Sequence, residues 1–432
     1  MKRLILFELM LLFLATTFES DSPPGWFQQT LPVTEIVRDI FFLDSLTGWV
    51  VSSNQTFPAN DTGYIMKTTN GGNNWVVQLD SMFNYYAVQF LDLSNGYAAG
   101  GTGRAKFLKT TNGGSSWGVT TPFGSNMYAI LDIAFVNKDT GWICGDDLSG
   151  GGVYKTTNGG INWQSQLGAS FKPTKLFFLN EDTGWVGTNE PNGRLFRTTN
   201  SGVNWDLQYT TNIAITSIFF LNSSNGWIRG GNTVGAMYST NGGFNWTNAQ
   251  GNVASGYDIK FVNDSIGYSG GGLQKVAKST DGGKNWGYQN IPIFDASQTF
   301  MFRNDTSLGW MGSNGLIKTT DGGGSITFTG IQQISDNVPS EYRLFQNYPN
   351  PFNPVTNIVY SIMSNVKGKM SKVVISLYDI TGREITKLID KEQNAGTYKV
   401  DWNAGSLPSG IYFYSLIIDG NTIDTKKMVM IK

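Results

Sequence analysis

A repeated pattern runs through most of this chain and constrains its fold more than any other feature. Each copy contains a short apolar run, a polar turn and then Gly-Trp or Gly-Tyr. The glycines of this pair are Gly48, Gly96, Gly141, Gly184, Gly226, Gly267 and Gly309. These seven glycines span 261 residues in six intervals, so their mean spacing is 43.5 residues. A fixed period of this length indicates a repeat architecture in which each copy is one supersecondary unit.

A second motif, Thr/Ser-x-Asn/Asp-Gly-Gly-x-x-Trp, occurs once in each period. It begins at Thr68, Thr110, Thr156, Thr198, Ser239, Ser279 and Thr319. Its two glycines supply the positive φ angles of a tight hairpin turn, although Ser201 replaces the first glycine of the fourth copy. Each period reads as four short strands with no helical stretch. Seven such periods predict an all-β fold with a seven-bladed β-propeller, and an open β-solenoid is the alternative.

The last copy lacks one residue of this motif. Ile326 stands where the other copies have Trp. Near the start of the chain, residues 25–30 contain Trp26 and resemble the strand that follows the turn in the other copies. We therefore expect residues 25–30 to complete the last blade, which would close the ring and remove its free sheet edges. The propeller would then occupy residues 21–330.

The two motifs resemble the Asp-box, or BNR, repeat, whose pattern is Ser/Thr-x-Asp-x-Gly-x-x-Trp. The fuller pattern is similar to the propellers of photosystem II assembly factors and related bacterial proteins, and it covers about residues 25–330. Five copies carry Asn in place of the acid, and only Asp281 and Asp321 retain it. Asp-boxes occur in sialidases, sortilin-like receptors and xyloglucanases alike. The resemblance therefore implies a fold and no particular chemistry.

Residues 1–20 are predicted to be a signal peptide. Lys2 and Arg3 precede an apolar run from Leu4 to Leu14, which is too short to cross a bilayer as a helix. An uncleaved N-terminal anchor is the alternative. No later segment approaches the apolar length of a membrane span, so we expect no transmembrane span in the mature protein.

The repeat stops after Gly330. Residues 331–343 are predicted to be a linker, and residues 344–432 show the alternating short strands of a small β-sandwich. Five motifs in this segment are similar to the type A sorting domain of type IX secretion, and they begin at Tyr348, Tyr378, Ala395, Leu407 and Lys427. The motif residues that we take as the sorting signature are Pro349, Asn350, Pro351, Gly382, Gly410, Tyr412 and Lys427.

This second resemblance implies a Bacteroidetes-type route of export. The type IX translocon of the outer membrane would read the domain, and a sortase-like peptidase would remove it, with attachment to surface lipopolysaccharide or release. A generic Ig-like accessory module is the alternative. We therefore expect a secreted protein or one displayed on the outer-membrane surface.

The composition excludes several classes of function. The chain has no histidine and a single cysteine, Cys144, so it cannot build a Ser-His-Asp triad, a histidine metal site or an intrachain disulfide. Its formal net charge of −1 offers no basic excess for nucleic acid. No cofactor is expected. We expect Cys144 to be buried, and the repeated tryptophans to pack between blades.

One set of residues is not explained by the repeat. We align the first strand of each copy on Phe42, Phe90, Phe135, Phe178, Phe220, Phe261 and Phe302. Three residues earlier stand Asp39, Ala87, Asp132, Lys175, Ser217, Asp258 and Thr299. Side chains alternate along a strand, so these residues face away from the aligned phenylalanine. First strands line the channel of a propeller.

The charged members of this set, Asp39, Asp132, Lys175 and Asp258, are therefore candidates for a cation or polar-ligand site at one channel mouth. A solvated polar start to each inner strand is the alternative, and the sequence leaves open whether a metal binds.

The sequence therefore favours a non-catalytic propeller that binds a glycan or a protein outside the cell. The competing class is an Asp-box hydrolase that acts on glycans. Such an enzyme needs two carboxylates about 5–10 Å apart. Its candidate acids are Asp39, Asp132, Asp258, Asp146 and Glu190. A third class is an assembly factor, against which the export signals argue.

Overall fold

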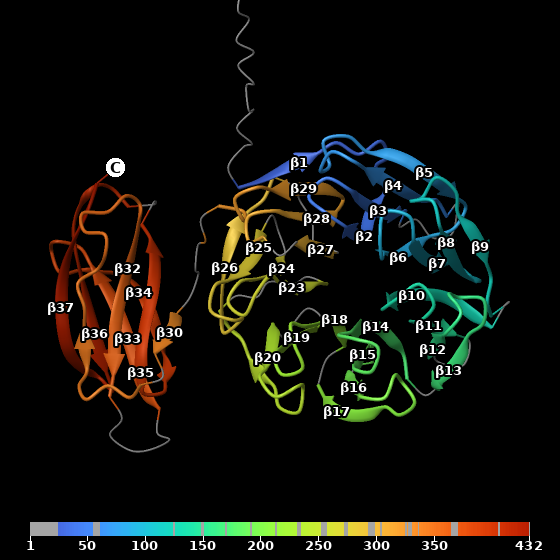
Figure 1. The fold of residues 1–432 in the computed structure, drawn as a ribbon. Helices are drawn as coiled ribbons and strands as arrows, with labels where there is room; N and C mark the ends of the chain where they lie inside the picture. The colour runs from blue at the N-terminus through green and yellow to red at the C-terminus, as the bar shows by residue number, and fades with distance from the viewer. Residues whose placement is uncertain are drawn as a thin grey trace, which may run out of the picture.

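The computed structural model describes most of the chain after residue 24. The described residues are 25–54, 61–123, 126–147, 151–168, 171–190, 192–211, 214–230, 235–251, 257–271, 275–292, 299–302, 305–324, 326, 331–335, 337–363, 370–404 and 407–431. The predicted signal peptide, residues 1–20, lies outside them. Every regular secondary-structure element in the described ranges is a β-strand, so this part of the chain is all-β (Figure 1).

Seven sheets from the described part of residues 26–319 are arranged in a ring around a central opening (Figure 1). In each sheet the first strand of the repeat lies nearest the centre. The first three sheets are β2 (Ile36–Phe42), β3 (Gly48–Ser53), β4 (Gly63–Thr68) and β5 (Val76–Ser81); β6 (Tyr85–Phe90), β7 (Gly96–Gly101), β8 (Ala105–Thr110) and β9 (Gly118–Thr120); and β10 (Met127–Phe135), β11 (Gly141–Asp147), β12 (Gly152–Thr156) and β13 (Gln164–Leu167).

The next three sheets continue the ring in chain order. They are β14 (Pro173–Phe178), β15 (Gly184–Thr188), β16 (Arg194–Thr198) and β17 (Asp206–Thr210); β18 (Ile215–Phe220), β19 (Gly226–Gly230), β20 (Ala236–Ser239) and β21 (Thr247–Asn248); and β23 (Ile259–Phe261), β24 (Gly267–Gly271), β25 (Lys275–Ser279) and β26 (Asn285–Asn290). The sixth sheet gains a short fifth strand, β22 (Gln250–Gly251), which runs parallel to β26.

The last sheet combines strands from opposite ends of the ring. It contains β27 (Thr299–Phe302), β28 (Gly309–Ser313) and β29 (Gly315–Thr319), and its outer strand is β1 (Trp26–Gln29). β1 pairs antiparallel with β29, with Trp26 opposite Thr319. Trp26 also packs edge-on against Phe302 at 5.9 Å between ring centroids, as Trp75 does against Phe42 in the first sheet. Residues 25–29 therefore supply the outer strand that β29 would otherwise lack.

Steric contact explains why each Gly-Trp or Gly-Tyr pair begins with glycine. Gly48 lies directly opposite Phe42 in the β2–β3 ladder. A Cβ atom added at Gly48 would lie 2.5 Å from Cδ1 of Phe42, because the phenylalanine ring lies across the glycine backbone. The other six glycines meet the aligned phenylalanine of their own sheet in the same way.

The aromatic residue after that glycine joins one sheet to the next. Trp49 of the first sheet stacks on Phe90 of the second, with ring centroids 3.5 Å apart. The same stacking recurs around the ring at 3.5 to 3.8 Å, in the pairs Tyr97–Phe135, Trp142–Phe178, Trp185–Phe220, Trp227–Phe261, Tyr268–Phe302 and Trp310–Phe42. Stacked pairs of this kind add to the free energy of burying the rings.

The turn motif is held by its own side chains. In the first copy, Thr68 Oγ1 donates to Asn70 Oδ1 at 3.0 Å and accepts from the N–H of Gly72 at 2.9 Å. Asn70 Oδ1 also accepts from the N–H of Asn74 at 2.9 Å. Gly71 and Gly72 have φ angles of 69° and 94°, which glycine adopts at little cost.

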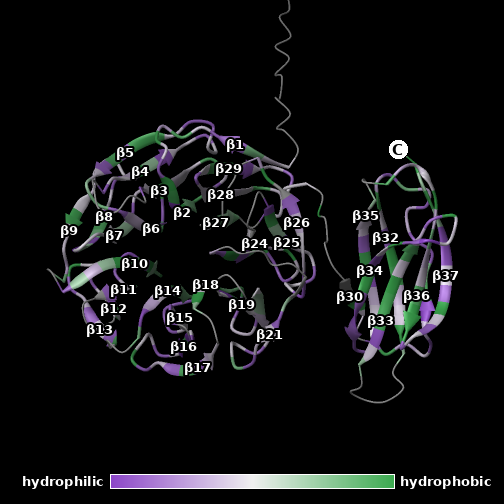
Figure 2. Ribbon diagram, turned by 180° about the vertical axis from the view of Figure 1, so that it is seen from behind, coloured by the Kyte–Doolittle hydropathy of each residue, from purple (hydrophilic) through white to green (hydrophobic). Residues whose placement is uncertain are grey.

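The C-terminal part folds as two packed sheets. One contains β30 (Ile331–Ser335), β35 (Gly396–Asn403), β32 (Val355–Ile362) and β31 (Arg343–Leu344). The other contains β34 (Glu384–Gln393), β33 (Ser371–Tyr378), β36 (Gly410–Ile418) and β37 (Asn421–Met430). Hydrophobic residues on the strands of both sheets form a shared core, and hydrophobic segments on the strands are visible in Figure 2.

The segment expected as a linker, residues 331–343, is shorter than the sequence suggests. Residues 331–335 form β30 and pair antiparallel with β35, with Ile331 opposite Val400. The sequence does not reveal this strand, because its composition is polar and because its pairing partner, β35, lies more than 60 residues away.

Within the described ranges, the structure contains no helix that is long and apolar enough to cross a bilayer.

Candidate functional site

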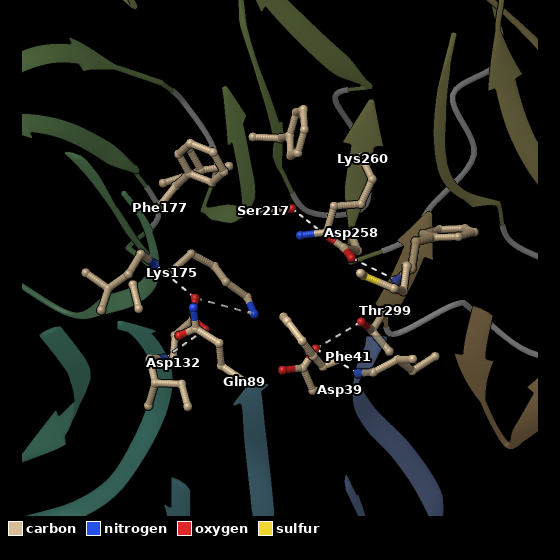
Figure 3. Close-up of a pocket in the computed structure, with 18 of the residues that line it drawn as sticks. Asp39, Phe41, Gln89, Asp132, Lys175, Phe177, Ser217, Asp258, Lys260 and Thr299 are labelled. Atoms are coloured by element: carbon tan, nitrogen blue, oxygen red, sulfur yellow. Dashed lines mark hydrogen bonds and ion pairs between the residues drawn. The ribbon is translucent and has the colours of Figure 1, made fainter. Parts of the chain in front are cut away.

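The four charged residues singled out by the alignment line one cavity. Asp39, Asp132, Lys175 and Asp258 come from four different sheets and surround the central channel (Figure 3). The cavity has a volume of about 370 Å³. Ser217 and Thr299, which occupy the same alignment position, also line it.

Asp39 is positioned by an irregularity in its strand. The β2–β3 ladder shifts register between Val37 and Asp39, so the backbone next to Asp39 leaves the regular pairing. Asp39 Oδ1 accepts from the N–H of Ile40 at 2.9 Å, and Oδ2 accepts from the N–H of Val88 in the next sheet at 2.9 Å. The carboxylate therefore joins two neighbouring inner strands.

The other two aspartates repeat this arrangement. Asp132 accepts from Ile133 N–H at 3.0 Å and from Leu176 N–H of the following sheet at 2.9 Å. Asp258 accepts from Ile259 N–H and Phe300 N–H, both at 2.9 Å. Both oxygens of each carboxylate are thus occupied by backbone donors. Each carboxylate therefore links neighbouring inner strands, while an oxygen that accepts a single N–H keeps a second lone pair.

Other side chains complete a closed circuit of hydrogen bonds, which we call the inner hoop. Gln89 donates to the carbonyl of Phe135 at 2.9 Å and accepts from its N–H at 2.7 Å. Thr174 donates to the carbonyl of Ile215 at 3.3 Å. The hydroxyls of Ser217 and Thr299 donate to Asp258 at 2.6 Å and to Asp39 at 3.2 Å. Together with the three aspartates, these bonds connect each inner strand to the next around the full ring.

The lysines of the channel are more exposed than the acids and make only long contacts with them. Lys175 Nζ lies 3.9 Å from Asp132 Oδ2, and Lys260 Nζ lies 3.8 Å from Asp258 Oδ1, so both contacts exceed hydrogen-bond length. The lysine side chains are 38% and 34% exposed, against 15% and 10% for their partner acids. Figure 3 shows both ammonium groups pointing into the open space between the strands.

Burial and charge act in opposite directions on this cluster. Burial raises the pKa of Asp39 to about 6, and the Lys175 ammonium and the Val88 N–H offset only part of that effect. Burial alone would lower the pKa of Lys175, but the carboxylates of Asp132, Asp39 and Asp258 raise it above its ordinary value. Lys175 therefore stays charged and supplies a cation of the protein's own among the three acids.

A second layer of channel residues was missed by the sequence alignment. It consists of the residue just before each aligned phenylalanine, namely Phe41, Gln89, Ala134, Phe177, Phe219, Lys260 and Met301, all of which line the cavity. The signal was available, because the alternation that exposes position 39 also exposes position 41.

The remaining candidate acids do not join this cluster. Glu190 pairs with Arg194, whose Nη2 lies 2.6 Å from Glu190 Oε2, and both line a separate surface pocket. Asp146 is exposed at the end of β11 and does not line the channel cavity. Cys144 is buried, as expected, and burial raises the pKa of its thiol well above the ordinary value. Over the described residues, no group of three His, Cys, Asp or Glu side chains is placed to hold a metal ion.

The sorting-signature residues lie in the two C-terminal sheets. Pro349, Asn350 and Pro351 precede β32, and Asn350 ties this segment to the last strand, because its Oδ1 accepts from the N–H of Val429 at 2.8 Å. Tyr412 of β36 donates its hydroxyl to the carbonyl of Pro408 at 2.8 Å. The other three positions are Gly382 in the β33–β34 turn, Gly410 at the start of β36 and Lys427 in β37.

Comparison with known families identifies this C-terminal part. Residues 346–432 match the secretion system C-terminal sorting domain. The sorting domain contains all seven signature residues and ends the chain after the ring. Its presence indicates export, with a secreted or surface location.

Solved structures show the fold of the ring. It is similar to the structure titled "YCF48 bound to D1 peptide", with a TM-score of 0.54, 20% identity, and coverage of 70% of this chain and 98% of the other. YCF48 from Cyanidioschyzon merolae gives a TM-score of 0.52 at 17% identity, with coverage of 68% and 98%. The WD40 β-propeller domain of Doa1 gives 0.51 at 12% identity, with coverage of 68% and 96%. The ring preceding the sorting domain is therefore a β-propeller. No curated protein matches the chain.

Proposed function

We propose that this chain is an exported seven-bladed propeller that binds a protein or a glycan outside the cell and catalyses no reaction. The observation that carries this proposal is the state of the three channel carboxylates. Both oxygens of Asp39, Asp132 and Asp258 accept backbone N–H groups. A nucleophile or general acid must present an oxygen to its substrate, whereas these carboxylates serve the ring.

The comparisons support a protein ligand in particular, because one propeller of similar fold is titled as bound to a peptide. The hydrogen-bonded Thr-x-Asn-Gly-Gly turns support the Asp-box interpretation, and the two packed C-terminal sheets support an Ig-like sandwich. We infer that residues 1–20 are a signal peptide, and that the propeller occupies residues 21–330. A type IX translocon would read the sorting domain, and a sortase-like peptidase would remove it.

The test is a binding screen of the full chain against a glycan array and a panel of extracellular proteins, run beside hydrolysis assays on the same glycans. We expect saturable binding and no released sugar. The raised pKa of Asp39 is the one observation that favours the alternative, a glycan hydrolase, since general acids often titrate near 6. Hydrolysis that disappears in both Asp39→Asn and Asp132→Asn would establish that alternative.

A further inference from the structure

The aspartates and the lysines of the channel differ in the hydrogen bonds that they make. All six oxygens of the three aspartates accept backbone donors, as described above. Lys175 and Lys260 make no hydrogen bond within the described residues, and their nearest acidic oxygens lie at 3.9 and 3.8 Å. A ligand that enters the channel therefore meets two ammonium groups whose N–H donors are free. Such a site favours a ligand that brings acceptor oxygens of its own.

Part of the wall around these ammonium groups is apolar. Phe177 and Phe219 meet edge to face at 5.5 Å between ring centroids, and Lys260 Nζ lies 5.9 Å from the centroid of Phe219. Phe41 and Met301, from the first and last sheets, line the same cavity and are only partly buried. Four large apolar side chains thus keep exposed surface in the channel cavity. Pockets for small ligands commonly combine such walls with a few polar groups.

We propose that the channel binds an apolar anion, a hydrophobic group that carries one carboxylate. The apolar part would contact Phe177, Phe219 and the opposite wall, and the carboxylate would accept hydrogen bonds from Lys260 and Lys175. A cavity of about 370 Å³ accommodates one group of this kind. The acid is either a free organic molecule or the end of a polypeptide. This inference rests on the proposed binding function where the acid is the end of a polypeptide, and it goes beyond that function where the acid is a free organic molecule.

The charge of the cavity is compatible with an anion. Its lining carries three acids and three bases, the bases being Arg38, Lys175 and Lys260. Burial raises the pKa of Asp39 to about 6, so near that pH part of the opposing negative charge is neutralised.

The experiment is titration calorimetry of the full chain with 3-phenylpropionate, with 3-phenylpropionamide as the neutral probe of the same shape. We expect the acid to bind at least tenfold more tightly than the amide. Lys260→Met removes the ammonium and should weaken binding of the acid at least tenfold, whereas Lys260→Arg should retain it. Lys138→Met is the matched control, because Lys138 is exposed in a turn, and it should have no effect. Unfolding followed by tryptophan fluorescence establishes that each variant is folded.

The outcomes separate this inference from the broader proposal. Equal binding of acid and amide, no binding of the acid at millimolar concentration, or indifference to Lys260→Met would overturn the apolar-anion site. Binding of a glycan or protein could still stand in each case, whereas glycan hydrolysis would overturn the broader proposal. A peptide that ends in Phe serves as a second probe. If it binds more tightly than the free acid, the source is a polypeptide, and if it binds more weakly, the source is a small molecule.

Discussion

Trp310 of the last sheet stacks on Phe42 of the first, with ring centroids 3.6 Å apart and an angle of 12° between ring planes. Both rings are fully or almost fully buried, and the indole N–H donates to the carbonyl of Gly71 at 3.3 Å. The pair belongs to the series that joins each sheet to the next, but here it connects residues 268 positions apart in the sequence. Ring closure therefore uses the same contact as every other junction.

Trp310→Ala should lower the free energy of unfolding of the propeller by about 3–5 kcal/mol, because it leaves a large cavity beside Phe42. Denaturant unfolding followed by tryptophan fluorescence measures this, since 12 of the 13 tryptophans lie in the propeller and Trp402 alone lies in the sorting domain. Ile161→Ala, at a side chain that is 78% exposed, is the control and should change stability little. Equal effects of the two variants would contradict the packing role of Trp310.

Gly48→Ala should destabilise the propeller, because the new methyl group would lie 2.5 Å from the Phe42 ring and displace it from its stack with Trp310. A loss of about 1–3 kcal/mol is typical of an overpacked core position. Gly168→Ala is the matched control, since no atom lies within 4 Å of its added Cβ. The same unfolding measurement applies, and a neutral Gly48→Ala would show that the ring can move aside.

Gln89→Leu tests the inner hoop. The substitution removes both side-chain hydrogen bonds to Phe135. The N–H and the carbonyl of Phe135 then lack these partners. We expect a loss of about 1–3 kcal/mol in unfolding free energy. Gln28→Leu, at an exposed position of β1, should cost much less. If both variants unfold at the same denaturant concentration, the hoop contributes little to stability.

Asp39 should make the propeller less stable as the pH rises from about 4 to about 6. Its pKa is about 6 in the folded chain and near 3.8 when unfolded, so the folded state holds the proton more tightly. The stability contributed by that proton is complete below the unfolded pKa and is lost as the pH passes the folded pKa, a change of at most roughly 3 kcal/mol.

The measurement for Asp39 compares wild type with Asp39→Asn at pH 4 and pH 7. The variant cannot lose this proton, so its stability relative to wild type should rise with pH. Asp92→Asn is the contrasting control, because hydrogen bonds from Asn95 lower the pKa of Asp92. Its stability relative to wild type should change little between pH 4 and pH 7, because the stability linked to a lowered carboxyl pKa is lost only as the pH falls below about 3.8. Parallel pH curves for wild type and Asp39→Asn would contradict the role given to Asp39.

Sequence periodicity was enough to predict the β-propeller and one layer of the residues that meet in the channel. The alignment on phenylalanine works because Phe42 and its counterparts all occupy one structural position, opposite a glycine and beneath an aromatic ring. It placed Asp39, Asp132, Lys175 and Asp258 around one cavity for the same reason.

The roles of those residues could not be read from the sequence. The carboxylate of Asp39 binds the N–H groups of Ile40 and of Val88 in the next sheet, and no residue pattern marks these bonds or the register shift before Asp39. The bonds of Gln89 to Phe135 depend on the distance between adjacent inner strands, which repeat length alone does not determine. The sequence therefore located four charged channel residues, while the structure shows that the acids accept backbone N–H groups and that the lysines make no hydrogen bond within the described residues.

The pairing of β1 with β29 has a consequence for assembly. Gly25 donates to Asp321 across 296 residues, and contacts this distant form slowly because a long loop must close first. Until β1 docks, β29 is an unpaired sheet edge that can accept any suitable strand. A neighbouring copy of the chain carries the same β1. Two copies that are concentrated or that fold slowly can therefore exchange their β1 strands. We therefore expect rapid docking of β1 to decide between closed monomers and strand-swapped oligomers.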